Sequence, residues 1–357
     1  MKILHIIDTL WLGGAQSVVK TFFEKETDNK DIFLYVLRQT EPQITIHHEN
    51  IIVHKSGSRY SLAPIAELKN IIMGKRIDIL HCHLPRAQVF GYILKRFYFP
   101  KIKLVFHEQG IIYDHPVVLP FLFNVFKKRI DAFIVCSENN KQELLKKVKN
   151  IEGKTFFLPN FVNTELHKAV QKIDKKGCRI KLGIDPNAFV IGFAGRLVQR
   201  KGWEELIEAA AVLKKEDNIH FVISGIGPEQ NMMLEMIAKN GLGKKITYLG
   251  YVSDMVPFYA AIDCLILPSH WEGMSLSQQE AIAAGLPVLI SESINDTTQG
   301  VFITFKNKDP KDMASKIMQQ RLRNSEGKMG LNEQLHAVLV KNEELFMSGL
   351  EEVYKSI

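Results

Sequence analysis

CLILPSHWEGMSLSQQEAIAAGLPVLIS, the sequence of residues 264–291, contains the pattern strand, loop, helix, strand. Its two outer runs, Cys264–Pro268 and Pro287–Ser291, are apolar on successive residues rather than on alternate ones. Such runs are typical of parallel strands that are buried on both faces. Parallel strands joined through a helix form a right-handed βαβ unit. The stretch therefore predicts an α/β fold.

The same alternation of strand-length apolar runs and helix-period segments extends over the chain. In Trp203–Leu213, for example, apolar residues recur with helical spacing, and Leu331–Ile357 has helical spacing without a strand signal. The βαβα order predicts doubly wound parallel sheets, each resembling a Rossmann domain. The remaining expected strands are Ile3–Ile7, Ile32–Leu37, Ile77–Cys82, Lys103–His107, Ala132–Ser137, Phe189–Ala194, His220–Ser224 and Thr247–Tyr251.

A length of 357 residues fits two sizeable domains rather than one. The composition shifts in the charged stretch Lys168–Asn187, and we place the domain boundary near its start. We expect an N-terminal domain of residues 1–167 and a C-terminal domain of residues 168–339, with a helix of about residues 340–357 that packs back on the first. Ligands of such domains bind at the carboxyl ends of the strands, here in a cleft between the two domains.

The composition indicates a globular protein of the cytoplasm. Hydrophobic residues make up 46% and charged residues 24%, and no apolar run is long enough to span a bilayer. The four cysteines form no CxxC pair, which favours a reducing compartment over disulfides or a zinc ribbon. The chain starts in a strand-like segment without a signal-peptide pattern. A net charge of +7 indicates an anionic partner: a membrane surface, a phosphorylated substrate or nucleic acid.

Two glycine-containing loops follow predicted strands. Gly13 and Gly14 would let the backbone approach a ligand at a helix N-terminus, which favours an anion. The alternative is a simple strand-to-helix turn. Gly225 and Gly227, in Ser224-Gly-Ile-Gly-Pro228, would line the same cleft, and a tight turn is the alternative there.

A third loop, Gly195-Arg-Leu-Val-Gln-Arg-Lys-Gly202, is basic and also joins a strand to a helix. The guanidinium of Arg196 is suited to bidentate phosphate contacts, and Lys201 adds a point charge. The alternative is a solvated basic loop. The flanking strand and helix favour a phosphate site.

The loop and helix of the opening stretch carry two glutamates. Glu272 follows the strand, and Glu280 comes later on the expected helix. Gly273 and the small Ser275 and Ser277 leave backbone N–H groups free at the helix start, which suits an anion. Because carboxylates accept hydrogen bonds from sugar hydroxyls, the combination predicts a nucleotide-sugar site. Two surface glutamates are the alternative.

The Glu-x7-Glu motif followed by Ala-Gly-Leu-Pro-Val resembles family 4 of the retaining glycosyltransferases, which have the GT-B fold. The resemblance covers nearly the whole chain in register. Its further motifs are Gly13-Gly14-Ala15, Ser137, Pro159-Asn-Phe-Val-Asn163, Gly195-Arg196-Leu197, Lys201-Gly202, Gly225-Ile-Gly-Pro228, Leu249-Gly250 and Pro268-Ser269.

The resemblance implies a role for each matching residue. Arg196 and Lys201 would bind the donor diphosphate. Glu272 would bind hydroxyls of the donor sugar, and Glu280 would bind the ribose. His107, at the end of a predicted strand, is similar to the family's histidine near the reacting sugar. A lone core or surface histidine is the alternative for it.

The resemblance also implies backbone contacts to the donor. The Gly13-Gly14 loop would approach the phosphates from the other domain, and Tyr251-Val252 would contact the base. The helix start would contribute Gly273, Met274, Ser275 and Leu276. His81 and His83 share one strand face as a metal pair would, but no third ligand with suitable spacing follows. We interpret them as acceptor-side or structural residues.

The implied reaction is retaining and needs neither metal nor cofactor, with a nucleoside-diphosphate sugar as donor substrate. Cations at Arg196 and Lys201 would stabilise the departing diphosphate. The two glutamates resemble the acid–base pair of a glycosidase, but we do not assign them that role. After Pro287-Val-Leu-Ile the family usually has Gly-Gly and an acidic residue, whereas this chain has Ser291-Glu-Ser-Ile-Asn-Asp. In this it resembles capsular and exopolysaccharide enzymes.

The expected partners are a UDP- or GDP-sugar and a saccharide acceptor, which a membrane lipid would carry. Gly91–Lys103 and Leu119–Arg129 mix basic and aromatic residues, as segments at an anionic membrane surface do. Ordinary core helices with solvated lysines are the alternative. An epimerase or hydrolase acting on a nucleotide-sugar without an acceptor is a second reading of the fold. We expect no nucleic-acid partner, because the basic residues form no recognisable motif.

Overall fold

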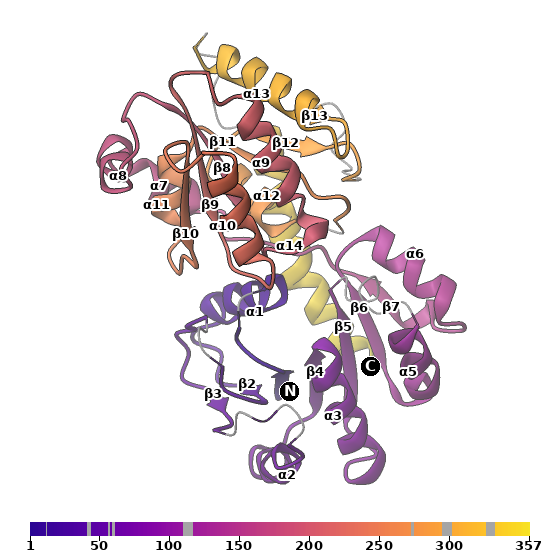
Figure 1. Cartoon of the computed structure of the whole chain (residues 1–357). Coiled ribbons are helices and arrows are strands. Elements are labelled where there is room, and N and C mark those ends of the chain that lie inside the picture. The colour runs from indigo at the N-terminus through magenta and orange to yellow at the C-terminus, as the bar shows by residue number, and fades with distance from the viewer. Residues whose placement is uncertain are drawn as a thin grey trace. The chain divides into compact units, whose positions relative to one another are not determined.

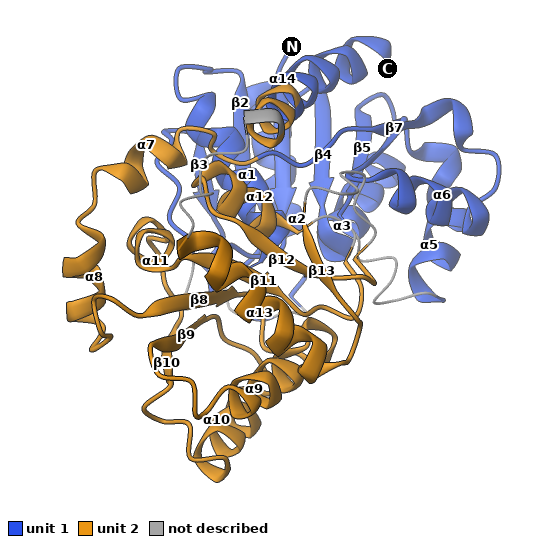
Figure 2. Cartoon of the chain, turned by 90° about the horizontal axis from the view of Figure 1, so that it is seen from above, with its two compact units in different colours: residues 1–161, 342–357 blue, residues 162–341 orange. Residues whose placement is uncertain are grey.

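The computed structural model describes residues 1–11, 13–40, 44–55, 58, 61–109, 117–272, 275–294, 302–325 and 333–357. The chain forms two compact units (Figure 2). Unit 1 comprises Met1–Phe161 and Asn342–Ile357, and unit 2 comprises Val162–Lys341. The sequence places the first boundary at residue 167, within helix α7 (Leu166–Gln171) of unit 2. The last helix, α14 (Glu333–Ser356), starts in unit 2 and ends in unit 1.

Unit 1 contains a parallel sheet that has seven strands within the described residues, in the order β3-β2-β1-β4-β5-β6-β7. Every pairing in it is parallel. The order reverses between β1 and β4, which are neighbours. The strands are β1 (Ile3–Ile7), β2 (Ile32–Val36), β3 (Ile51–Val53), β4 (Ile79–His83), β5 (Lys103–Glu108), β6 (Ala132–Val135) and β7 (Thr155–Phe157).

The helices of unit 1 cover the two faces of this sheet with different chemistry. Leu4, Leu80 and Phe106 face an apolar core that α2, α3, α5 and α6 complete. The opposite face carries histidines and meets α1 and the C-terminal part of α14. The helices are α1 (Gly14–Lys25), α2 (Pro64–Lys75), α3 (Leu84–Phe97), α5 (Val118–Phe126) and α6 (Glu138–Lys147), with 3-10 turns at Lys127–Arg129 and Glu152–Lys154.

Unit 2 contains a second parallel sheet, which has six strands in the described part of the chain, in the order β10-β9-β8-β11-β12-β13. Its order reverses between the neighbours β8 and β11. The strands are β8 (Phe189–Ala194), β9 (Ile219–Ser224), β10 (Ile246–Gly250), β11 (Cys264–Leu267), β12 (Val288–Ser291) and β13 (Ile303–Phe305).

Both faces of the second sheet are apolar. One packs against α9, α10 and α13, and the other against α11, α12 and the start of α14 (Figure 1). The helices of unit 2 besides α7 are α8 (Lys175–Lys181), α9 (Trp203–Val212), α10 (Gln230–Lys239), α11 (Val256–Ala261), α12 (Leu276–Ala283) and α13 (Pro310–Ser325), with a 3-10 turn at Gln199–Lys201.

The two doubly wound parallel sheets that the sequence predicts are confirmed. Each predicted strand is present, with its ends shifted by at most two residues. The strands that the sequence did not predict are β3, β7 and β13, and each lies at the edge of its sheet. In the described part of the chain, we find no helix with the length and apolarity that a bilayer crossing requires.

Candidate functional site

The central feature of unit 2 is the pair of loops that follow β8 and β11. These strands are neighbours at the point where the strand order reverses. At such a point the loops diverge to opposite sides of the sheet and leave a place for a ligand at the carboxyl ends. The first loop carries Arg196 and Lys201, and the second carries Glu272. The fold therefore brings together residues that lie some 70 positions apart in the sequence.

Lys201 and Glu272 form an ion pair with a direct hydrogen bond from Nζ to Oε1. Ser269 Oγ donates a second hydrogen bond to the same oxygen, at 2.8 Å. The Glu272 side chain is only 7% exposed. Burial alone would raise the pKa of Glu272, but Lys201, Ser269 and the charge of Arg200 outweigh it and lower that pKa. Glu272 is therefore a fixed, ionised acceptor.

The two arginines of the first loop differ in their surroundings. Arg196, the predicted phosphate ligand, is exposed. Arg200, which the sequence did not single out, lies over the Trp271 ring at 4.6 Å from its centroid. The backbone N–H of His270 also donates to the Arg200 carbonyl oxygen at 2.8 Å. These contacts hold the two loops together. The sequence signal that could have indicated Arg200 was a basic residue in the first loop together with an aromatic residue, Trp271, in the second.

Glu280, the second glutamate of the motif, lies on α12 and accepts a hydrogen bond from Tyr259 Oη at 2.7 Å. Tyr259, on α11, is fully buried. Burial, and then the Glu280 charge, raise the pKa of Tyr259 well above its ordinary value, so the phenol stays protonated. The structure thus orients Glu280 through a residue that sequence reasoning missed. Tyr259 belongs to a short apolar helix in which it resembles a core residue.

The glycines near this edge allow loops to touch. A Cβ atom at Gly225 would lie 1.9 Å from the Gly195 carbonyl oxygen, and one at Gly227 would lie 2.1 Å from that of Leu197. Gly202, with φ of 69°, is the N-cap of α9, and a Cβ atom there would lie 2.0 Å from the Pro268 carbonyl oxygen. Close packing of the loops therefore explains why glycine occupies these three positions. A role of Gly225 and Gly227 in ligand binding stays a prediction.

The other residues proposed for the donor have these positions. Tyr251 and Val252 follow β10 and are half-buried. Ser275 is buried before the first turn of α12, which starts at Leu276. Gly273 and Met274 lie outside the described residues.

In unit 1, the neighbouring ends of β1 and β4 carry an ion cluster. Asp8 accepts a hydrogen bond from Arg86 Nη1 at 2.8 Å and one from Arg38 Nη2 at 3.2 Å. The sequence did not single out any of these three residues. Gly13 is the N-cap of α1, which starts at Gly14, and both glycines are exposed.

His107 does not stand alone. It lies on β5, is 1% exposed, and accompanies His5 of β1 and His81 and His83 of β4 on one face of the sheet. Burial lowers the pKa of all four imidazoles, to about 3 at His5 and His107. The histidines are therefore uncharged at neutral pH.

The sequence shows no third ligand with suitable spacing after His81 and His83, but the fold brings an earlier histidine, His5, next to the pair. One ring nitrogen each of His5, His81 and His83 lie within 4.8 Å of one another. The third histidine precedes the pair on another strand, so the search for spacing after the pair missed it. However, His81 stacks on His83 and on His5, with centroids 4.4 Å and 4.6 Å apart. Since a metal lies in the plane of each imidazole that binds it, stacked rings do not converge on one ion.

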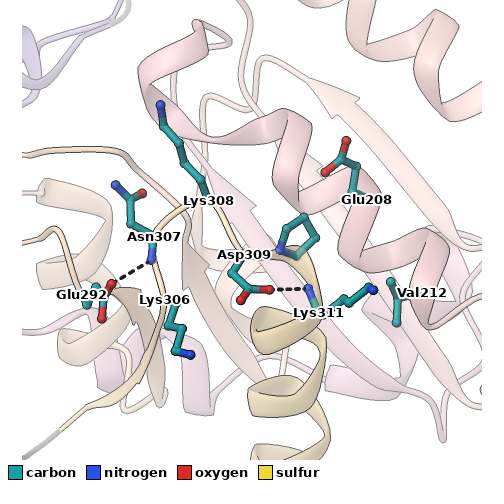
Figure 3. A pocket seen from close by; sticks show the side chains of 9 residues that line it. Glu208, Val212, Glu292, Lys306, Asn307, Lys308, Asp309 and Lys311 are labelled. Carbon is teal, nitrogen blue, oxygen red and sulfur yellow. Dashed lines mark hydrogen bonds between the residues drawn. The ribbon is translucent and has the colours of Figure 1, made fainter.

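A hollow of about 690 Å³ lies in unit 2 between α9 and the loop from β13 to α13 (Figure 3). It contains neither Lys201 nor Glu272, and charges of both signs line it. Hydrogen bonds from the backbone N–H of Asn307 to Glu292 and of Lys311 to Asp309 hold its wall. The motif residues at the ends of β8 and β11 therefore lie outside this hollow. The lining residues are Glu208, Val212, Glu292, Lys306, Asn307, Lys308, Asp309, Pro310 and Lys311.

Known proteins support an enzyme of the kind that the motifs indicate. The family model for glycosyl transferases group 1 matches residues 174–326, and that for glycosyltransferase family 4 matches residues 21–166. The O-antigen biosynthesis glycosyltransferase WclY of Escherichia coli is 20% identical over 95% of this chain and 93% of its own. A galactosyltransferase of Escherichia coli, described as UDP-Gal:alpha-D-GlcNAc-diphosphoundecaprenol alpha-1,3-galactosyltransferase, is 28% identical over 82% of this chain and 79% of its own.

The solved structure of HepE from Anabaena, in complex with UDP-glucose, matches all of this chain with all of its own. Its TM-score is 0.81 at 19% identity, which shows a common fold. The two Rossmann-like sheets are those of the GT-B fold. The two family models follow each other along the chain and together leave little of it unmatched. The chain belongs to family 4 of the glycosyltransferases.

Proposed function

We propose that this glycosyltransferase retains the anomeric configuration of a hexose-type sugar and moves it from a nucleoside-diphosphate sugar to a lipid-linked saccharide. The product would be part of a cell-surface polysaccharide. The observation that carries the proposal is the partly buried Lys201–Glu272 pair at the ends of β8 and β11. It combines an ammonium suited to a diphosphate with an ionised carboxylate suited to sugar hydroxyls.

The donor contacts follow from this geometry. Lys201 and the exposed Arg196 bind the diphosphate, and Glu272 accepts hydrogen bonds from hydroxyls of the sugar. Glu280, which Tyr259 orients from α11, accepts from the ribose hydroxyls. The sugar and the ribose are then held by two carboxylates whose positions other side chains fix. Such preorganisation limits the cost of ordering side chains when the donor binds.

In the reaction, the bond between the anomeric carbon and the diphosphate oxygen breaks, and a bond to the acceptor hydroxyl oxygen forms. The acceptor attacks from the side that the diphosphate leaves, which gives retention. The hydroxyl proton passes to the departing diphosphate. Lys201 and Arg196 stabilise the negative charge that develops there, and we assign this role to them without a metal.

The names of similar proteins support the choice of substrates. The Escherichia coli galactosyltransferase is described as using UDP-Gal and a diphosphoundecaprenol-linked acceptor, and HepE was solved with UDP-glucose. A UDP-sugar is accordingly our first choice over a GDP-sugar. WclY is described as acting in O-antigen biosynthesis, which supports a cell-surface product.

Contact with an anionic membrane completes the proposal, because a lipid-linked acceptor lies there. Within Leu119–Arg129, Phe121 is 67% exposed and Val125 is exposed on the same side of α5; Val118, the residue before this segment, is exposed on that side too. Leu119 and Phe123 on the opposite side are buried. Basic residues Lys127–Arg129 follow directly. Exposed apolar side chains beside positive charge suit a lipid surface.

The donor is tested by a thermal-shift screen of UDP-, GDP- and ADP-sugars, because a ligand that binds the native state raises its melting temperature. We expect a UDP-sugar to stabilise the wild type and to lose this effect in Glu280→Ala. The stabilising donor is then incubated with and without a membrane lipid extract. Transfer that needs the extract supports the proposal. Equal consumption of donor without it would indicate the epimerase or hydrolase instead.

The membrane contact has its own test, flotation with vesicles of anionic lipid at low and high salt. We expect co-flotation at low salt, and a loss of it in Phe121→Ser. Leu234→Ser, which removes an exposed apolar side chain on α10 of unit 2, is the matched control. Failure of the wild type to float at low salt would reject the contact and leave the donor site untouched.

A further inference from the structure

The buried histidines of unit 1 form a continuous hydrogen-bonded series with one tyrosine. Tyr354 belongs to α14, whose C-terminal part lies beside β4 and β5 (Figure 1). His83 Nε2 lies 3.1 Å from His5 Nδ1, and His5 Nε2 lies 3.4 Å from Tyr354 Oη. Tyr354 Oη lies 2.5 Å from His81 Nδ1, and His81 Nε2 lies 3.2 Å from His107 Nδ1. The order is therefore His83, His5, Tyr354, His81, His107.

The two ends of this series are open. Among the described residues, neither His83 Nδ1 nor His107 Nε2 has a hydrogen-bond partner, although both atoms are buried. His83 and His107 pair with each other across β4 and β5, so both ends lie at the carboxyl edge of the sheet. A buried polar atom without a partner is costly and calls for a functional reason.

The protons of the series can be counted. Each neutral imidazole carries one N–H, and the phenol carries one O–H, so five protons serve four hydrogen bonds. One proton remains for one end. If all four bonds are made and Tyr354 donates its own O–H in one of them, the bonds must point in one direction, and the four histidines must share one tautomer. The other arrangement, in which Tyr354 accepts from both His5 and His81, would leave its buried O–H without an acceptor in the series. Either all carry the proton on Nε2 and His107 is the open donor, or all carry it on Nδ1 and His83 is.

The distances favour the first direction. The contact between Tyr354 and His81, at 2.5 Å, is that of an O–H donor, whereas the 3.4 Å contact with His5 suits a weaker N–H donor. Tyr354 then donates to His81 and accepts from His5. In this arrangement His107 presents an Nε2–H group, and His83 presents an acceptor.

We propose that His83, His5, Tyr354 and His81 are positioning residues that hold His107 as a hydrogen-bond donor toward a saccharide oxygen. The role of His107 as a hydrogen-bond donor to the saccharide rests on the proposed glycosyl transfer. His107 then donates to the sugar at Nε2 and does not accept the proton of the acceptor hydroxyl. Burial keeps every imidazole uncharged, which the alternation of donors and acceptors requires.

The series is tested by nitrogen-15 NMR of histidine-labelled protein at neutral pH, since the two ring nitrogens report the tautomer directly. We expect the Nε2–H tautomer at His5, His81, His83 and His107 alike. Tyr354→Phe removes only the hydroxyl, and we expect His107 to become a mixture of tautomers. Phe346→Leu alters packing against His107 but removes no hydrogen-bonding group of the series, so it should leave the tautomers unchanged. Mixed tautomers or charged imidazoles in the wild type would overturn the proposal.

The role toward substrate has a separate readout, UDP release from UDP-glucose or UDP-galactose in the presence of the membrane lipid extract, with whichever donor the wild type consumes. In Tyr354→Phe we expect kcat to fall about tenfold, which is the size of one lost hydrogen bond, while KM for the donor stays the same. Uniform tautomers with unchanged kcat in this variant would overturn the positioning role. A wild type that consumes none of the UDP-, GDP- and ADP-sugars of the screen in the presence of the extract would contradict the proposed function, whereas the NMR result would still decide the series.

Discussion

In unit 1, β1, β4 and β5 hold four uncharged histidines under α14, whereas in unit 2, β8 and β11 end beside the ion pair of Lys201 and Glu272. The same doubly wound sheet thus accommodates buried polar groups in two ways. In unit 1, burial removes the charge, and neutral donors and acceptors alternate. In unit 2, opposite charges offset burial, and the carboxylate stays ionised.

The difference suits two kinds of ligand. A diphosphate needs compensating positive charge, which only a charged site provides. Saccharide hydroxyls are neutral and need directed donors and acceptors, which uncharged imidazoles provide. The comparison therefore agrees with the proposed roles: cations and carboxylates of unit 2 bind the donor phosphates and hydroxyls, and the neutral His107 of unit 1 donates to a saccharide oxygen. Each of the following experiments tests the explanation for one of the two units.

Acidification should have the largest effect, and it should act on unit 1. Below pH 6.5 the unfolded chain protonates its histidines, while the native His5 and His107, with pKa near 3, stay neutral. The free energy of unfolding therefore decreases as the pH falls from 6.5 toward 3. Each such histidine lowers the free energy of unfolding by about 1.4 kcal/mol for each pH unit in this range. Hydrogen exchange at pH 7 and pH 5, corrected for intrinsic rates, measures this in β4 and β5.

Peptides from β8 and β9 serve as the internal control for that experiment. His220 of β9 is half-buried, and burial lowers its pKa to about 4, so unit 2 should lose some protection as well. Unit 1 should lose more, because it has four such groups. Protection in β4 and β5 that does not change between the two pH values would contradict the neutral state of the histidines.

The second-largest effect should come from a buried ion pair of unit 2, between α8 and the residue before β11. Arg179 Nη2 donates to Asp263 Oδ2 at 2.7 Å, and the Arg179 side chain is 5% exposed. Asp263→Asn would leave that charge buried without a counter-charge, and we expect a loss of about 3–5 kcal/mol in unfolding free energy. Urea denaturation measures it.

Glu165→Gln is the control, because it breaks the exposed pair of Glu165 with Lys168. We expect that variant to change stability by less than about 1 kcal/mol. An equal effect of Asp263→Asn and Glu165→Gln would mean that charge pairing does not stabilise unit 2, and the contrast with unit 1 would fail.

Lys201→Ala tests the charged site itself. We expect kcat to fall by about 10²–10³-fold, the loss seen when one group that stabilises developing negative charge is removed. The variant also leaves Glu272 buried without its cation, so the pKa of Glu272 should rise. Lys215→Ala, which removes an exposed lysine after α9, is the control. Near-normal transfer by Lys201→Ala would refute the assignment of the donor site.

The sequence predicts most of this architecture, and its omissions have physical causes. Central strands such as β8 are buried on both faces and therefore form continuous apolar runs, whereas the edge strands β3, β7 and β13 are three residues long and only partly buried. Such short segments carry little pattern. The structure pairs Lys201 with Glu272, and the sequence singled out both because their motifs lie next to strand ends.

The side chains that orient His107 and Glu280 were not predicted, because they come from other elements of the fold. His5 and Tyr354 are 349 residues apart, and only the fold places them beside each other. Tyr259 lies among apolar residues of α11, where an aromatic ring is expected in any core. A motif identifies the groups that meet the ligand, but it does not identify the side chains that orient them.

Tyr259→Phe should have the smallest effect, and it tests this distinction. The variant keeps the ring in the core and removes the hydroxyl that Glu280 accepts from. A hydrogen bond to a charged group contributes about 1.5–3 kcal/mol, so we expect donor affinity to fall about tenfold or somewhat more. The fall should be smaller than in Glu280→Ala, because Glu280 remains and only its orientation is relaxed. Tyr92→Phe, at a stacked pair in unit 1, is the control for the lost hydroxyl. If Tyr259→Phe bound the donor as tightly as the wild type, Glu280 would not need its partner, and unit 2 would hold its ligand by the charges of Lys201 and Glu272 alone.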